Sequence, residues 1–352
     1  MLSAFWSGAG EELARHWVAR VLTPAFAFWM GGLALVWWHR QAEEVPVNGW
    51  LGELAASGDA LARLPVLVLG ALVVGGLVLV AASAVVAERL TGPLLRLLEG
   101  YWTLPRWLWQ RMVTHRKKHR DKISERVREL QLRQRRDTLT IPEFVELRRL
   151  RTDPMADAKR KEVLEEGAAA GLTAHETIKL GRDLQRLRTT PQRDDLRMPT
   201  RLGDALRAAE HRPNVRYGLD AVVCWSALWL VLPADTRGEL IATRTALDAA
   251  VRGWLWGALF LVWTPFSFWA VLVGVGICLL SYHFGVLPRG VTYGRLIVTA
   301  YDLHRMKLYD ALYLPRPTSP ANERSVAGPR VTKALSGTLD EAGLTYRFDV
   351  SA

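Results

Sequence analysis

The stretch that decides the fold is Leu64 to Ala87, LPVLVLGALVVGGLVLVAASAVVA, which runs for 24 residues without a charge. A helix needs about 20 apolar residues to cross the hydrocarbon core of a bilayer. Two more runs lack charges: Val21 to Trp38, with 18 residues, and Gly253 to Tyr282, with 30 residues. Because the charges lie between such runs, the sequence disfavours an ordinary cytosolic enzyme, a disordered chain and a disulfide-rich secreted scaffold. It predicts a multipass membrane protein.

The third run is too long for one comfortable span. Pro265 lies near its middle and disfavours helix at the residue before it. We therefore expect a tight hairpin, with one helix ending near Thr264 and a second ending near Val286. A rival topology uses Ala221 to Leu232 as a thin third span and 253–282 as one tilted fourth span. The predicted fold is an all-α integral membrane protein with four transmembrane helices in two hairpins and a basic helical cytosolic insert.

Charge sets the expected orientation. Residues 88–216 hold 30 Lys and Arg against 19 Asp and Glu, so this segment alone carries a net charge of +11. Basic segments beside spans stay in the cytosol, which predicts that both termini are cytoplasmic. The expected domains are an amphipathic lead-in with the first hairpin at 1–87, a basic helical cytosolic domain at 88–216, an interfacial segment, second hairpin and amphipathic helix at 217–315, and a mobile tail at 316–352.

Tryptophan and cysteine usage agrees with a membrane location. Trp rings favour the two membrane–water interfaces. The expected interface anchors are Trp37, Trp38, Trp102, Trp107 and Trp109. Cys224 and Cys278 are too few for a disulfide framework. Arg outnumbers Lys 38 to 8, a bias that suggests a GC-rich bacterial genome and hence a bacterial inner membrane.

The most basic part of the chain is 106–136, with 12 Lys and Arg against three acids. Ile123, Val127 and Leu130 fall on one stripe of the expected helix. Basic side chains beside a membrane gain from anionic lipid, so we expect this stretch to bind anionic headgroups or a protein partner. Missing recognition motifs disfavour nucleic acid. The candidate binding residues are Arg111, Arg116, Lys117, Lys118, Arg120 and Lys122.

The three apolar runs contain no ionisable Asp, Glu, Lys, Arg or His. Intramembrane charges normally mark ion or proton pathways, so their absence disfavours a proton-coupled transporter. Small residues at four-residue spacing let helix backbones approach, which favours packing within the chain and also allows a homo-oligomer. The residues expected to pack in this way are Gly31, Gly75, Gly253, Gly257 and Gly274.

No acid, base and nucleophile assemble in the sequence, and no nucleotide, zinc or hydrolase motif occurs. The sequence therefore predicts no catalytic residue, no cofactor and no metal. Capping boxes at Thr140 to Glu143 and Thr173 to Glu176 predict helices to about Arg151 and Arg188, and a further helix is expected near 200–211.

One region is specified more closely than its composition requires. It contains Pro199-Thr-Arg-Leu-Gly-Asp-Ala-Leu-Arg-Ala-Ala-Glu210, Arg216-Tyr-Gly-Leu-Asp-Ala-Val-Val-Cys-Trp225 and Leu228-Trp-Leu-Val-Leu-Pro233. Here the chain resembles a family of uncharacterised bacterial, largely actinobacterial, multipass membrane proteins, best over 199–316. The resemblance implies no established activity. From the residues themselves, Arg201, Arg216 and Asp220 are candidates for ion pairs beside the membrane.

Together these features favour a non-enzymatic membrane anchor or scaffold that presents 88–216 to a cytosolic partner or to anionic lipid. The alternative is an oligomeric channel or a membrane-perturbing effector, which the small residues and the juxtamembrane basic helices also allow.

Overall fold

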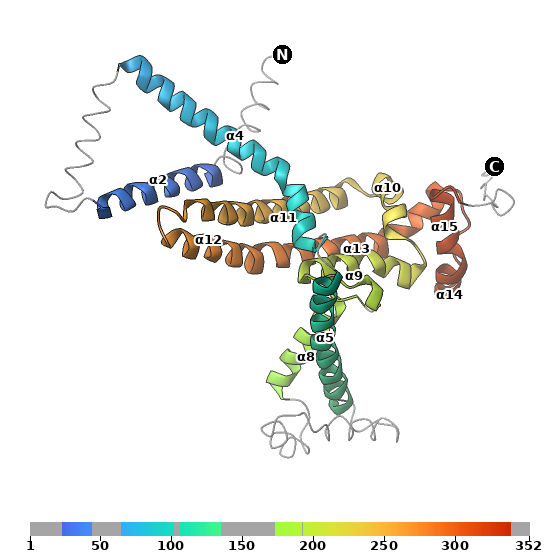
Figure 1. The fold of residues 1–352 in the computed structure, drawn as a ribbon. Helices are drawn as coiled ribbons and strands as arrows, with labels where there is room; N and C mark the ends of the chain where they lie inside the picture. Colours follow the sequence, from blue (N-terminus) through green and yellow to red (C-terminus); the bar gives the residue numbers. More distant parts are fainter. Residues whose placement is uncertain (1–22, 44–64, 102–105, 135–172, 192, 339–352) are drawn as a thin grey trace, which may run out of the picture. The chain divides into compact units, whose positions relative to one another are not determined.

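The computed structural model describes residues 23–43, 65–101, 106–134, 173–191 and 193–338, and these residues form helices and turns without a strand (Figure 1). An all-helical fold is therefore confirmed for the described part of the chain. The chain divides into two compact units, each built from separated segments. Unit 1 comprises residues 1–97 and 238–293, and unit 2 comprises residues 98–237 and 294–352.

The described residues contain three helical segments that are long and apolar enough to cross a membrane. They are Leu67–Glu99, Ala234–Trp263 and Trp269–Ala311. The sequence expectation of membrane-spanning helices is supported at this level. Helix α2 (Thr23–Glu43) covers most of the first predicted span, but it is not among the three, since its Trp and Gly residues and its charged end lower its mean hydropathy.

Unit 1 contains the predicted hairpin. Helix α11 (Ala234–Phe260) continues as a short 3₁₀ turn at Leu261–Trp263, and α12 (Trp269–Leu280) returns beside it (Figure 1). A Cβ on Gly257 would lie 2.8 Å from Ile277 Cγ2, so the two backbones approach closely. The reversal falls around Pro265, as predicted, but the expected helix end near Val286 is wrong, because the second helix continues to Ala311. One continuous helix over 253–282, the rival interpretation, is wrong.

An aromatic core joins α2, α4 (Val66–Glu99) and α11 within unit 1. Ala25, Val80, Ala84, Ala87, Leu255 and Trp256 are buried there. Phe28 packs against Trp29, Trp256, Phe260 and Trp263 with ring centroids 5.3–6.3 Å apart. The indole N–H of Trp29 donates to Ser83 Oγ at 3.2 Å. The polar tip of this Trp is thus satisfied inside the unit.

Unit 2 begins where α4 ends. Gly100 has φ = +97°, a left-handed conformation that favours glycine, and α5 (Arg106–Gln134) follows. The helix is therefore interrupted at Gly100, before α5 begins. Helix α8 (Ala174–Arg188) starts with the predicted capping box, in which Thr173 Oγ1 accepts from the Glu176 N–H at 3.3 Å and Glu176 accepts from the Thr173 N–H at 3.0 Å.

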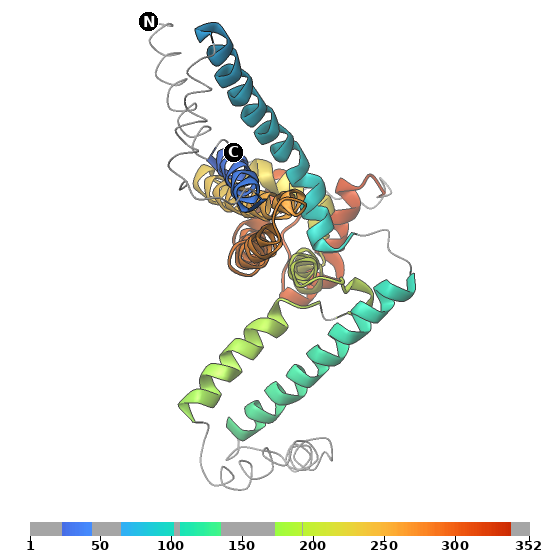
Figure 2. The ribbon, with the colours of Figure 1, turned by 60° about the vertical axis from the view of Figure 1, so that its left-hand side comes forward.

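Helices α5 and α8 lie side by side along much of their length (Figure 2). The predicted stripe of Ile123, Val127 and Leu130 is buried, and its partner is Leu180 of α8, with Leu184 and Leu187 packed beside it. Arg133 of α5 reaches Glu129 at 2.9 Å and Glu176 at 3.3 Å. An apolar seam and an ion pair thus hold these two helices together.

Helix α9 (Arg201–Tyr217) is fixed at its N-terminus to the end of α4. Thr200 caps α9, because its Oγ1 accepts from the Gly203 N–H at 3.0 Å while it donates to the Glu99 carbonyl at 2.8 Å. A Cβ on Gly203 would lie 2.0 Å from that same carbonyl oxygen. Only glycine fits this contact without a shift.

The remaining helices of unit 2 cover α9. Helix α10 (Ala221–Val231) is capped by Asp220, and Tyr301 of α13 (Leu287–Ala311) donates to the Ala221 carbonyl at 2.8 Å. A π-helical turn (Ser281–Val286) joins α12 to α13. After α13 come α14 (Pro320–Asn322), a π-helical turn (Glu323–Ala327) and α15 (Gly328–Leu335), and a 3₁₀ turn (Asp194–Leu196) precedes α9.

The sequence predicts a mobile tail over 316–352, whereas the structure places residues 320–335 in helices that pack on the rest of unit 2. Val331 is fully buried, and Thr332 Oγ1 accepts from the Asp220 N–H at 3.0 Å. Ser319 caps α14, so the Pro- and Ser-rich composition marks helix starts here rather than mobility. Residues 339–352 lie outside the described part.

The two units also differ from the linear domains expected from sequence. Segments 217–237 and 294–338 belong to unit 2 with the basic insert, whereas 238–293 belongs to unit 1 with the first two apolar helices. The lead-in 1–20 and the predicted helix at 140–151 lie outside the described residues.

Candidate functional site

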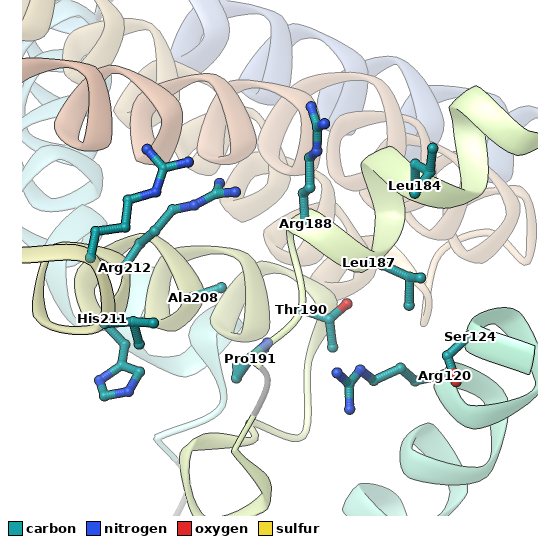
Figure 3. A pocket seen from close by; sticks show the side chains of 12 residues that line it. Arg120, Ser124, Leu184, Leu187, Arg188, Thr190, Pro191, Ala208, His211 and Arg212 are labelled. Carbon is teal, nitrogen blue, oxygen red and sulfur yellow. The ribbon is translucent and has the colours of Figure 1, made fainter. Parts of the chain in front are cut away.

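The most distinctive site in unit 2 is a cavity of about 480 Å³ between α5, the end of α8 and α9 (Figure 3). We call it the arginine cavity. Arg120 extends from α5 towards Thr190 and Pro191, and Arg188 and Arg212 come from α8 and α9. The lining residues are Arg120, Ser124, Leu184, Leu187, Arg188, Thr190, Pro191, Ala208, His211, Arg212, Val215 and Arg216.

A second cavity of about 260 Å³ adjoins the first, because Arg120, Leu187 and Thr190 line both. Its other lining residues are His115, Arg116, His119, Ile123, Arg186, Arg201 and Asp204. Arginine therefore contributes four side chains to each cavity, with Arg120 common to both.

Local structure explains why arginines from three helices line one cavity. Arg212 and Arg216 are four residues apart and so lie on one face of α9. Arg188 is the last residue of α8, where the chain turns through Thr190 and Pro191 towards α9. The α5–α8 seam places Arg120 opposite this turn. Three separate helices thus supply the charges.

Few carboxylates balance these charges in the described part of the chain. No carboxylate lines the arginine cavity, and neither Arg120, Arg188 nor Arg212 has a salt bridge to a described residue. The Nε of Arg120 is buried without a described hydrogen-bond partner. Burial, followed by the charges of Arg216 and Arg188, lowers the pKa of Arg212, although Asp302 acts in the opposite direction.

Arg216 is the exception in this group, because Asp302 neutralises it. The Arg216 Nη1 donates to both oxygens of Asp302, at 2.9 and 3.2 Å. Tyr217 donates to the same carboxylate at 2.7 Å. This acid is therefore already occupied, and it leaves the charges of Arg120 and Arg188 unbalanced.

A buried carboxylate anchors the smaller cavity. Asp204 accepts from the Met198 N–H at 2.8 Å and from Arg116 Nε at 3.2 Å. Desolvation nevertheless raises the pKa of Asp204, and the Arg116 charge offsets only part of that effect. Arg116 thus ties α5 to α9 and is committed to a structural contact.

The predicted basic site residues separate into three groups. Arg116 and Arg120 line cavities, whereas Lys117 forms an ion pair with Asp194. Arg111, Lys118 and Lys122 are exposed, and no salt bridge to another described residue involves them. The helix places the first group on its α9-facing side and the last group towards solvent.

The expected interface Trp residues that the structure describes differ in exposure. Trp38 and Trp107 are 64% and 65% exposed, and Trp37 is half-buried. Trp102 lies outside the described residues, and the side chain of Trp109 is not described. Their role as anchors stays a prediction.

The glycines expected to pack have different surroundings. A Cβ added to Gly31 would lie 3.1 Å from Phe260. A Cβ on Gly253 would lie 3.0 Å from Ser281 Oγ, and one on Gly274 would lie 2.8 Å from Leu261. These three glycines and Gly257 are therefore closely packed within unit 1. Gly75 has no described atom within 4 Å of its Cβ position.

The ion-pair candidates Arg201, Arg216 and Asp220 have different surroundings. Arg216 forms an ion pair with Asp302, Asp220 caps α10 by accepting from the Val222 N–H at 2.9 Å, and Arg201 lines the smaller cavity. The partner of Arg216 was not predicted, because α13 brings Asp302 to the end of α9 from a distant part of the sequence.

Sequence reasoning missed Arg188, Arg212 and His211 as site residues. The four-residue spacing of Arg212 and Arg216 was a usable signal, but nothing in the sequence showed that the end of α8 returns beside them. Among the described residues, no group of three His, Cys, Asp or Glu is placed to hold a metal.

Comparison with known proteins finds no matching family model, no similar curated protein and no similar solved structure. The resemblance to a bacterial membrane-protein family therefore stays a prediction.

Proposed function

We propose that this protein is a non-enzymatic anchor of a bacterial inner membrane. In this proposal four spans cross the bilayer and both termini lie in the cytosol. The basic helical surface of unit 2 is presented there to a cytosolic protein partner or to anionic lipid. The supporting observation is that α5 has one face buried against α8 and another face that is basic and exposed.

One side of α5 is committed to folding. Ile123, Val127 and Leu130 are buried against α8. Arg111, Lys118 and Lys122 are exposed, without salt bridges to described residues. A helix docked through an apolar stripe displays its charged face in a fixed orientation, and such a face attracts anionic surfaces.

The surface of α4 supports the membrane part of the proposal. Leu67, Leu72, Val74, Leu77 and Val78 are 57–87% exposed. A continuous exposed apolar surface of this kind is unfavourable in water and is typical of a face that contacts lipid or a protein. Lipid accounts for it directly, because the helix is long enough to span.

The test is affinity purification of the full chain from native membranes, followed by mass spectrometry. The test variant replaces Arg111, Lys118 and Lys122 with Gln. The control replaces three exposed basic residues of unit 2 far along the chain, Arg295, Lys307 and Lys333, and so removes the same charge. We expect the α5 variant either to lose a stoichiometric protein partner or to be no longer retained by anionic vesicles. The control variant should keep both properties. Equal retention by all three proteins contradicts the proposal.

A further inference from the structure

We infer that the arginine cavity is a binding site for a phosphate ester that carries an apolar group. The inference rests on the proposed function in placing unit 2 at the cytosolic membrane surface, and it deepens that function by naming the ligand chemistry. The ligand is either the headgroup of an anionic phospholipid or a soluble organic phosphate, since both present the same phosphate ester.

The arginine cavity holds positive charge that no described acid neutralises. Arg120, Arg188 and Arg212 reach the cavity without a salt bridge to any described acid, and the nearby Asp302 already binds Arg216 and Tyr217. Burial lowers the pKa of Arg212, and the like charges of Arg216 and Arg188 lower it further. A bound anion removes this repulsion and supplies the missing partner.

The donors that line the cavity are of the type that suits a phosphate group. Guanidinium groups bind phosphate through paired N–H donors in a fixed planar geometry, which Lys cannot reproduce. The cavity is lined by Arg rather than Lys, and the buried Nε of Arg120 has no described acceptor. A buried donor without an acceptor is costly, so an acceptor oxygen from a ligand stabilises this side chain.

The size of the cavity and its apolar lining favour a ligand larger than inorganic phosphate. The volume of about 480 Å³ lies within the range of ordinary small-molecule sites and exceeds what one phosphate needs. Leu184, Leu187, Pro191 and Val215 line the space beside the charges. The cavity therefore offers an apolar surface to the group esterified to the phosphate.

The alternative is a cavity whose arginines are simply hydrated. Hydrated arginines bind all small anions weakly and respond only to the total charge of the protein. A built site depends on particular arginines and favours an ester with an apolar group over inorganic phosphate. The two accounts thus differ in a measurable way.

The experiment uses the full chain in phosphatidylcholine nanodiscs. Phenyl phosphate and inorganic phosphate are titrated calorimetrically into the wild type and into Arg120→Gln, Arg212→Gln and Arg182→Gln. Arg182 is the matched control, because it is exposed on α8, has the same charge and lies outside the cavity lining. We expect phenyl phosphate to bind more tightly than inorganic phosphate, and each cavity variant to weaken this binding about tenfold, as for the loss of one charge-assisted contact. Arg182→Gln retains wild-type affinity.

A second arm distinguishes the two ligand sources. The wild type is placed in nanodiscs that contain phosphatidic acid. If the headgroup is the ligand, it occupies the cavity and phenyl phosphate no longer binds, whereas Arg212→Gln shows no such competition. If phenyl phosphate binds equally in both lipids, the ligand is a soluble ester. Either result supports the site.

Three results overturn the inference. The first is that phenyl phosphate does not bind the wild type in phosphatidylcholine nanodiscs. The second is that Arg182→Gln weakens phenyl phosphate binding as much as the cavity variants do. The third is that the wild type binds inorganic phosphate as tightly as phenyl phosphate. Misfolding is detected separately, because we expect Arg212→Gln to melt no lower than the wild type without ligand, as it relieves charge repulsion. A protein that captures its partner but binds no phosphate ester refutes this inference alone. A protein that binds the ester but presents no partner or lipid surface refutes the proposed function alone.

Discussion

At the scale of single residues, the position of α9 depends on contacts too close for any side chain. Gly203 faces the Glu99 carbonyl at the end of α4, and Gly328 faces the Tyr217 carbonyl, where a Cβ would lie only 1.9 Å away. Glycine is required at both positions because backbone, not a flexible side chain, fills the space. These contacts hold the arginine-bearing face of α9 in register with the rest of unit 2.

Replacing Gly203 tests this requirement. We expect Gly203→Ala to lower the free energy of unfolding by about 1–3 kcal/mol, since the added methyl forces α9 away from Glu99. Gly181 on α8 is the control, because its Cβ position is open. Gly181→Ala should be neutral or stabilising by up to about 1 kcal/mol. Thermal melting of both variants measures the difference, and equal melting temperatures would refute the close contact.

Arg116 has a structural role beside the cavities, because it forms an ion pair with Asp204. Its partner Asp204 is buried, and desolvation raises the pKa of that carboxyl. Because the folded-state pKa lies above the unfolded value, the contribution of Asp204 to stability falls as pH rises through the folded pKa. Arg116 limits that loss only while Asp204 is ionised.

We therefore expect Arg116→Ala to cost about 1–2 kcal/mol at neutral pH. The cost should become small when the pH falls below the raised pKa of Asp204, where the carboxyl is neutral and needs no counter-charge. Unfolding followed across pH measures this dependence, with Arg111→Ala as an exposed control on the same helix. A cost that is the same at acidic and neutral pH is incompatible with this role.

Sequence predicted part of the candidate site at this scale. Arg116 and Arg120 were named because they lie in the most basic stretch. Arg188 and Arg212 were not, because the charge density around them is ordinary. Their importance arises from the turn at Thr190 and Pro191, which returns the chain from α8 to α9, and that path depends on tertiary contacts.

At the scale of elements, local patterns predicted helices better than their partners. The period of Ile123, Val127 and Leu130 predicted the buried side of α5, and the capping box predicted the start of α8. Neither pattern indicated that these two helices pack on each other. Pro265 likewise located the hairpin turn because its effect on the backbone is local.

The α5–α8 seam gives a direct prediction. We expect Leu180→Ala to destabilise the seam by about 2–4 kcal/mol, because Leu180 is buried against α5. Hydrogen exchange read by mass spectrometry should then rise in α5 and in α8 together. Ile178→Ala provides the control, since this side chain on α8 is 63% exposed. Faster exchange confined to α8 would show that the two helices do not support each other.

The C-terminal helices show where composition misleads. Pro, Ser and Gly over 316–338 suggested mobility, yet Ser319 and Pro320 begin a helix and Gly328 permits a close backbone approach. Glu323 is buried and accepts from Arg305 at 2.8 Å. Such residues are read correctly only when their partners on α9 and α13 are known.

At the scale of the whole molecule, the chain is organised by discontinuous segments. Unit 1 combines the first apolar helices with 238–293, and unit 2 combines the basic insert with 294–338. A division of the sequence at changes in composition cannot detect these discontinuous units, because each boundary between them falls inside a helix: α4, α11 or α13. The apolar and basic characters themselves were readable from sequence, since they depend on composition rather than contacts.

The central claim is that the exposed basic face of α5 lies in the cytosol of a membrane-anchored protein. A single Lys118→Cys substitution, with Cys224 and Cys278 replaced by Ser, tests it most directly through labelling by a membrane-impermeant maleimide. Lys118 is exposed, so a folded protein leaves the thiol accessible. We expect labelling in inside-out membrane vesicles and none in intact spheroplasts. Labelling of intact spheroplasts would place this face outside the cell and contradict the claim.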